Sequence, residues 1–179
     1  MTGVRPPASA QQIQQWEDEH YPYKLPDDLK AFLAFSNGVE AAWDILLRPG
    51  ATPICGAGRL RINDVAHLQR LPLDADDQAA LGGDPAPPLG FCAVDGSDQS
   101  KSGTSQVWLQ EPGGMWCAIA DDITCYLRLA AAHAYVHGWH HAYAPAGLSP
   151  PTERLLALVA PARLQFDQEM LHDAEGALD

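Results

Sequence analysis

The first apolar positions of the chain recur at helical spacing. Ser9 stands three residues before Gln12, which is the spacing of a capping box. Ile13 and Trp16 follow at the separation that places them on one face of a helix. This pattern predicts a first helix over residues 10–20.

A second helix is predicted to begin near Pro26, because proline and acidic residues are favourable in a first helical turn. Its end is expected at Ser36-Asn37-Gly38, since Asn and Gly adopt the left-handed conformation at little cost. The apolar residues expected to form its buried stripe are Leu29, Phe32, Leu33 and Phe35.

After residue 38 the pattern changes to short apolar or alternating runs, which are typical of strands. A turn at Glu111-Pro112-Gly113-Gly114 joins two of these runs into a predicted hairpin. The runs predicted as strands are residues 42–47, 59–62, 89–94, 106–110 and 115–120.

Helical periodicity returns over residues 123–136, capped by Asp121-Asp122, and over residues 152–159. Helices, then strands, then helices indicate an α+β fold with a mainly antiparallel sheet flanked by N-terminal and C-terminal helices. We expect a single domain. Its predicted limits are an irregular lead over residues 1–9, the folded domain over 10–167 and a frayed acidic tail over 168–179.

Charge excludes several classes of partner. The 179 residues include 11 Lys and Arg against 23 Asp and Glu, a net charge of −12. A chain of that charge is unsuited to nucleic-acid phosphates or to anionic lipid. The N-terminus shows no secretory signal, and the longest apolar run is far shorter than the roughly 20 residues of a membrane helix. We therefore expect a cytoplasmic protein.

Four histidines lie close together at His133, His137, His140 and His141. If the helix continues through residue 136, His133 and His137 share one face, as a zinc pair would. A catalytic zinc also needs a third ligand and a base, and no His-Glu-x-x-His pattern is present. Packing at a helix end is the preferred interpretation; a small enzyme using this cluster is the weaker alternative.

No assembled active site is visible in the sequence. Phosphate-loop, nucleophile-elbow and dinucleotide fingerprints are missing. The cysteines are Cys55, Cys92, Cys117 and Cys125, and their apolar neighbours favour buried free thiols of a reducing compartment. The sequence predicts a protein that is not an enzyme and that needs no metal or cofactor.

Leu25-Pro26-Asp27-Asp28-Leu29-Lys30-Ala31-Phe32, followed by Ser36-Asn37-Gly38, resembles the signature of the Smi1/Knr4 (SUKH) superfamily. Within it, residues 10–167 are similar to the tubulin polyglutamylase complex subunit 2 family. The later positions that carry this similarity are Trp116, Asp121, Tyr126-Leu127-Arg128-Leu129, His133, Trp139, Ala142-Tyr143, Gly147-Leu148-Ser149-Pro150 and Pro161.

The resemblance implies a non-catalytic subunit that helps to assemble or localise a tubulin-modifying complex, at the cytoskeleton or ciliary base. In that family a separate ligase-like subunit attaches the glutamate. Animal members carry a Lys-rich C-terminal extension, whereas this chain ends on an acidic segment. Because acidic tubulin tails would repel the chain, the expected contact is a partner subunit.

The wider superfamily supplies the alternative, an immunity protein that binds and neutralises a basic toxin, which an acidic surface would attract quickly. Either function requires a contact surface. Trp139 is weighed both as a core anchor and as part of that surface. The candidate protein-contact residues are Trp139, His140, Tyr143, Asp74, Asp76 and Asp77.

Overall fold

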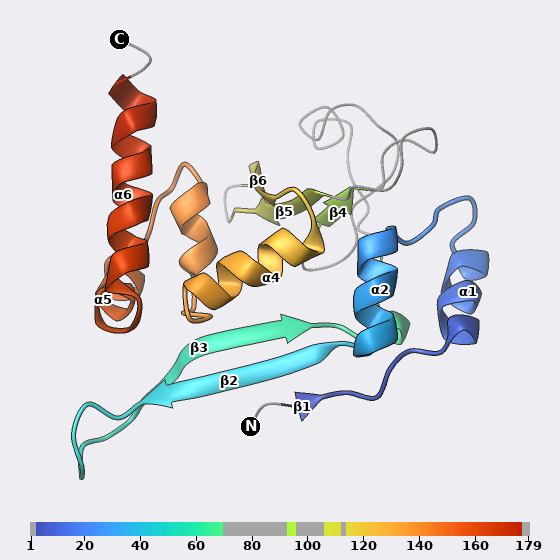
Figure 1. The fold of residues 1–179 in the computed structure, drawn as a ribbon, viewed down its shortest axis with the longest axis horizontal. Helices are drawn as coiled ribbons and strands as arrows, with labels where there is room; N and C mark the ends of the chain where they lie inside the picture. Colours follow the sequence, from blue (N-terminus) through green and yellow to red (C-terminus); the bar gives the residue numbers. More distant parts are fainter. Residues whose placement is uncertain (1–2, 70–92, 96–105, 112–113, 177–179) are drawn as a thin grey trace. The chain divides into compact units, whose positions relative to one another are not determined.

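The computed structural model describes residues 3–69, 93–95, 106–111 and 114–176 (Figure 1). In this part of the chain, helices and small antiparallel sheets alternate in a mixed α+β order. The elements are β1 (Gly3–Val4), α1 (Ala10–Glu19), α2 (Asp27–Phe35), β2 (Val39–Ile45), β3 (Ile54–Ile62), the 3-10 turn η1 (Val65–His67), β4 (Ala93–Asp95), β5 (Gln106–Gln110), β6 (Trp116–Ala120), α4 (Ile123–Ala132), the 3-10 turn η2 (Trp139–Tyr143), α5 (Pro150–Val159) and α6 (Pro161–Gly176).

The two N-terminal helices follow their predictions closely. The capping box of α1 is present, with the Ser9 side chain accepting from the backbone of Gln12 and the Gln12 side chain accepting in return. Helix α2 buries Leu29 and Leu33 against Trp16 of α1. Phe35 was expected in the same stripe and is 74% exposed. Six residues after Leu29 is 240° around a helix, which turns Phe35 away from the buried face.

The glycine of the Ser36-Asn37-Gly38 stop has the predicted left-handed conformation, with φ of 84°. A Cβ on Gly38 would lie 2.7 Å from the carbonyl oxygen of Ile62, so the position also requires the absence of a side chain. The Asn37 side chain accepts a hydrogen bond from the backbone of Val65 at 2.8 Å. The turn thus joins the end of α2 to the segment that follows β3.

Two three-stranded sheets are present among the described residues, in the orders β1-β2-β3 and β4-β5-β6. The predicted hairpin is confirmed as β5 and β6, which pair antiparallel with a register shift at Val107/Trp108. Strand β1 was not predicted: Gly3 and Val4 pair with the start of β2 inside the segment expected to be irregular. Two residues are too few to give a recognisable alternation.

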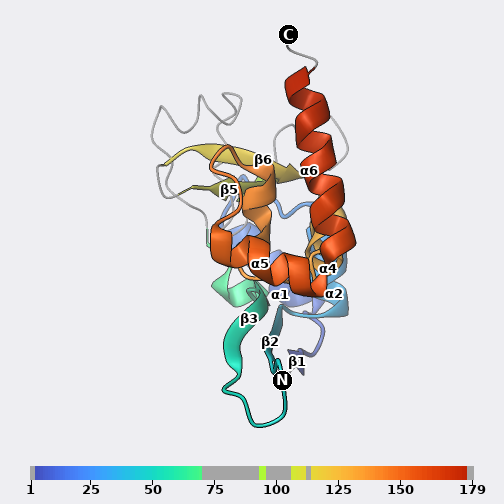
Figure 2. The same cartoon turned by 90° about the vertical axis from the view of Figure 1, so that its left-hand side faces the viewer.

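The C-terminal helices differ most from prediction. Helix α4 ends at Ala132, four residues before the expected end. Pro161 begins α6, which continues to Gly176, so residues 168–176 of the expected frayed tail are helical. Proline at a first helical position is favourable because its missing N–H has no partner there in any case. Helix α6 begins directly after α5 (Figure 2). Gln168 on α6 donates to Glu153 on α5 at 3.2 Å, which ties the two helices together.

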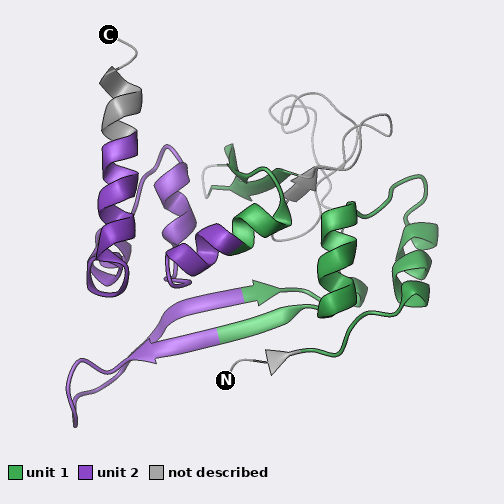
Figure 3. Ribbon diagram, viewed as in Figure 1, with its two compact units in different colours: residues 1–41, 61–127 green, residues 42–60, 128–179 purple. Residues whose placement is uncertain are grey.

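The chain divides into two compact units, residues 1–41 with 61–127 and residues 42–60 with 128–179 (Figure 3). The division passes through β2, β3 and α4, so each unit contains parts of shared elements. The core of the second unit is Val136, Leu156 and Leu164, with Trp43 packed against it. None of the helices in the described ranges is long and apolar enough to cross a membrane.

Candidate interaction site

The segment of residues 133–143 leaves α4 through two unusual backbone conformations. Ala134 and Tyr135 have φ of 50° and 56°, in the left-handed region that costs L-residues about 1–2 kcal/mol each. Trp43 Nε1 donates to the Ala134 carbonyl at 2.8 Å, and the Arg59 backbone N–H donates to the Tyr135 carbonyl at 2.8 Å. These bonds from β2 and β3 hold the turn in place.

This turn removes the condition under which His133 and His137 would share a helix face, which was that the helix continues through residue 136. Helix α4 has ended before either residue, and the backbone N–H of His137 donates to the Ala57 carbonyl of β3 at 3.0 Å. His133 is completely buried, whereas His137 is exposed. The two rings therefore do not form a zinc pair. In the part of the chain with described side chains, no three His, Cys, Asp or Glu residues are grouped as metal ligands.

Both ring nitrogens of the buried His133 face acceptors. Nδ1 lies 2.7 Å from the Leu129 carbonyl oxygen, and Nε2 lies 2.7 Å from Oδ2 of Asp167 on α6. A carbonyl oxygen only accepts, and an ionised carboxylate only accepts. Each ring nitrogen thus has an oxygen within hydrogen-bond distance, and the buried ring joins the end of α4 to α6.

Asp167 is shared by two further groups. Arg163, one turn earlier on α6, places its guanidinium 2.6 Å from Oδ1, and the Tyr143 hydroxyl donates to the same oxygen at 3.4 Å. Arg163 also donates to the Tyr143 oxygen. Burial, reinforced by the Asp167 charge, raises the pKa of Tyr143, which keeps its hydroxyl protonated. We call His133, Tyr143, Arg163 and Asp167 the Asp167 network.

Trp139 packs inside this network rather than on the surface. Its ring stacks on His133 with centroids 4.8 Å apart and meets Tyr143 edge-on at 6.1 Å. Only 3% of Trp139 is exposed, so of the two roles weighed for it the structure places the ring in the interior. A stacked pair of aromatic rings is a favourable arrangement in a protein interior.

The remaining predicted contact residues are placed as follows. His140 and Tyr143 on η2 are half-buried, so each presents part of its side chain to solvent. Their role in a contact stays a prediction. Asp74, Asp76 and Asp77 lie outside the described residues.

His140 gives the 133–143 segment a dependence on pH. Burial lowers its pKa from 6.5 to about 4, and the charges of His141 and His137 act in the same direction. The unfolded chain therefore binds a proton that the folded chain does not, between about pH 6.5 and 4. The stabilising contribution of neutral His140 is present above pH 6.5 and is lost as the pH falls through this window.

We expect His140→Gln to flatten the pH dependence of unfolding. Lowering the pH from 7.5 to 5 should destabilise the variant by about 1 kcal/mol less than the parent chain, after allowance for partial solvent exposure. Urea unfolding at a series of pH values measures the difference. Identical pH profiles for the His140 variant and the parent would contradict the assignment.

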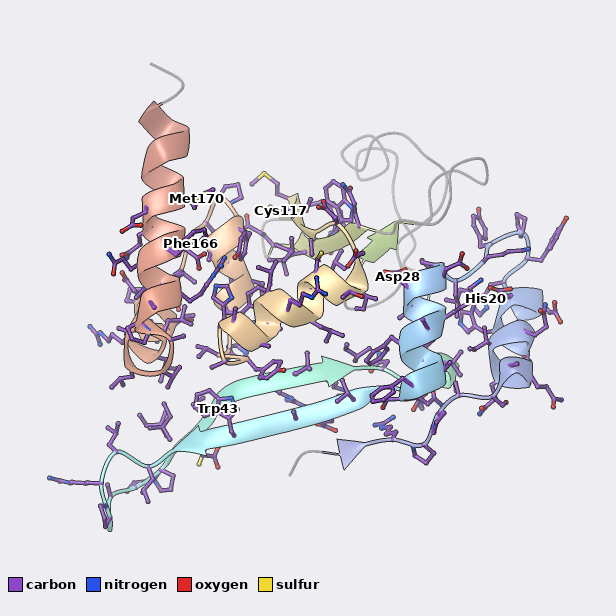
Figure 4. The ribbon with its side chains drawn as sticks, in the orientation of Figure 1. His20, Asp28, Trp43, Cys117, Phe166 and Met170 are labelled. Carbon is purple, nitrogen blue, oxygen red and sulfur yellow. The ribbon has the colours of Figure 1, made fainter. Side chains whose placement is uncertain are left out.

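The Asp167 network continues to the surface through Arg163. Its guanidinium carbon lies 4.9 Å from the centroid of the Phe166 ring, and Phe166 is 49% exposed. Met170, one turn further along α6, is 56% exposed (Figure 4). Neither residue was predicted as a contact, because the last helix predicted from the sequence ends at residue 159, before α6 begins. The signal in the sequence is a proline at position 161, which is favourable at the start of a helix, followed by two apolar residues four positions apart, Phe166 and Met170.

The cysteines are only partly as expected. Cys117 on β6 is buried, and burial raises the pKa of its thiol, with Glu111 adding to the shift. Cys55 is exposed and Cys125 is half-buried, so the expectation of buried thiols is wrong for Cys55. Cys55 is at the start of β3, where the first three residues of the strand are all exposed. Cys92 lies outside the described residues.

Comparison with known proteins gives one informative match. The chain is 24% identical over 190 aligned residues to the human Tubulin polyglutamylase complex subunit 2. The match covers 88% of this chain but 62% of that protein, so the chain spans less than two thirds of its relative. No family model matches the chain, and no solved structure matches it. The findings support a loose similarity to a subunit of a protein complex.

Proposed function

We propose that the chain is a non-catalytic protein-interaction subunit that helps to assemble or localise a tubulin polyglutamylase-type complex at the cytoskeleton. The similarity to the human complex subunit carries this proposal, because it extends along most of the chain. The chain binds partner subunits and leaves the ligation of glutamate to another protein. Its net charge of −12 favours a partner subunit over the acidic tails of tubulin as the direct contact.

The geometry of the second unit agrees with a binding role. Histidine, carboxylate and phenol groups are typical of catalytic sites. In the Asp167 network, the Asp167 carboxylate contacts His133, Tyr143 and Arg163. Nε2 of His133 faces Asp167, and the whole side chain is buried. A group in that position connects helices and does not reach a substrate. The Asp167 network thereby holds the surface residues of η2 and α6 in fixed positions.

The alternative function is that of a SUKH-type immunity protein, which the acidic charge favours to the same degree. An inhibitor of a basic toxin gains rapid, electrostatically steered association. The relative does not point in that direction, because its name is that of a tubulin polyglutamylase subunit. The two functions predict different partners, which makes them separable by one experiment.

The test is recovery of the tagged chain from its native cells, followed by mass spectrometry of the proteins that accompany it. We expect a tubulin-tyrosine-ligase-like enzyme and its companion subunits, retained after a wash in moderate salt. The tag alone is the control. Recovery of a basic toxin domain, with tubulin and ligase missing, would replace the proposal by the alternative.

A second measurement addresses the absence of catalysis. The purified chain is incubated with tubulin, ATP and labelled glutamate, alone and together with the recovered ligase. Label should enter tubulin only when the ligase is present. Incorporation by the chain alone would show that the non-catalytic assignment is wrong.

A further inference from the structure

Helix α6 carries an exposed apolar face that its own unit leaves uncovered. Leu164 and Asp167 face inward, at 8% and 6% exposure. Phe166 and Met170 are four residues apart and therefore lie one turn above each other on an adjacent face, at 49% and 56% exposure (Figure 4). Large exposed apolar side chains grouped in this way are typical of a contact surface.

This face lies in the most uniformly acidic part of the chain. Arg163 is the last Lys or Arg in the sequence, and its guanidinium is engaged with Asp167, Tyr143 and the ring of Phe166. Glu169, between Phe166 and Met170, is exposed and accepts from Gln165 at 2.9 Å. The acids that follow Arg163 in the sequence are Asp167, Glu169, Asp173, Glu175 and Asp179.

The face is also held in a fixed orientation. Asp167 binds His133 at the end of α4, and Gln168 binds Glu153 on α5, so α6 is attached at successive residues next to Phe166. Arg163 covers one side of the Phe166 ring. A surface that is ordered before binding loses less conformational entropy when a partner docks.

We propose that Phe166 and Met170 of α6, with Glu169 beside them, form a docking face for an amphipathic partner helix whose apolar side is flanked by Lys or Arg. The apolar pair supplies the area that is removed from water, and the acidic residues select a basic partner over an acidic one. The inference deepens the proposed function: the role of this face in a complex rests on that function. Its ability to bind a basic amphipathic helix does not.

The probe is a synthetic amphipathic helical peptide of Leu and Lys, titrated into the full-length chain by calorimetry. We expect a Kd on the order of 10 µM, because two side chains bury less area than a standard interface. The affinity should fall as salt is added. Phe166→Ser combined with Met170→Ser should weaken binding by about tenfold. The matched control is Phe35→Ser, at an aromatic on α2 that is still more exposed, at 74%.

Equal affinities for the Phe166/Met170 double variant and the parent would overturn the docking face, since they would show that the peptide only senses net charge. Tight binding of the corresponding Leu and Glu peptide would overturn the selection by charge. Circular dichroism confirms that the double variant is folded, as expected for exposed positions. If the cellular complex is recovered while the peptide fails to distinguish the variants, this inference alone fails. If the complex is not recovered while the peptide does distinguish the variants, the proposed function is rejected and the docking face is retained.

Discussion

Asp167→Ala is expected to lower the free energy of unfolding by about 3–5 kcal/mol, because it leaves the Arg163 guanidinium and the buried His133 ring without the carboxylate that they share. His133 is fully buried and loses the oxygen that lies 2.7 Å from its Nε2. Arg163 and Tyr143 lose the same carboxylate. The loss exceeds that of a surface ion pair, which contributes roughly 0–1 kcal/mol, because water cannot replace the missing charge. Urea unfolding of the parent and the variant measures the change.

The matched control for this prediction is Glu169→Ala, an exposed acid two residues further along α6, which should change stability by no more than about 0.5 kcal/mol. A double-mutant cycle with His133→Phe separates the ion pair from other effects. If the contact between His133 and Asp167 stabilises the fold, Asp167→Ala should be less destabilising in the His133→Phe background. Equal effects in the two backgrounds would show that the pair is not coupled.

Sequence patterns predicted the parts of the fold that depend on neighbouring residues. The capping box at Ser9, the stop at Gly38 and the hairpin of β5 and β6 are all local, so a short window contains the whole signal. Strand β1 and the end of α4 depend on residues far away in the sequence. Hydrogen bonds from Trp43 and Arg59 fix the left-handed turn at residues 134–135. The sequence of the turn itself contains no pattern that indicates these two partners.

The candidate site shows the same limit more clearly. The sequence indicated that the histidine cluster is packed at a helix end, and His133 is indeed buried there. Its partner Asp167 is 34 residues away and lies on α6, a helix that was not predicted. Charge pairing between distant elements leaves no periodic trace. The exposed pair Phe166 and Met170 was not predicted either, because the face of a helix can be recognised only when the helix itself has been predicted.

Gly58→Ala is expected to destabilise the protein by about 3 kcal/mol, because the added methyl group has no space. A Cβ on Gly58 would lie 1.9 Å from Nε1 and 2.1 Å from Cε2 of Trp43. The indole would have to move, and its hydrogen bond to the Ala134 carbonyl at 2.8 Å would break. That bond is one of those that hold the strained turn leading into His137 and η2.

The control for Gly58→Ala is the same change in a Trp43→Ala chain, where the ring that obstructs the methyl group is missing. The substitution should then cost less than about 1 kcal/mol, leaving only the backbone preference of the two residues. Thermal unfolding of the four chains in this cycle gives the coupling. An equally large loss in both backgrounds would mean that Gly58 is needed for a reason other than its approach to Trp43. A large coupling would show that the close approach of Gly58 on β3 to Trp43 on β2 also stabilises the 133–143 segment. Trp43 makes that connection, because its Nε1 donates to the Ala134 carbonyl.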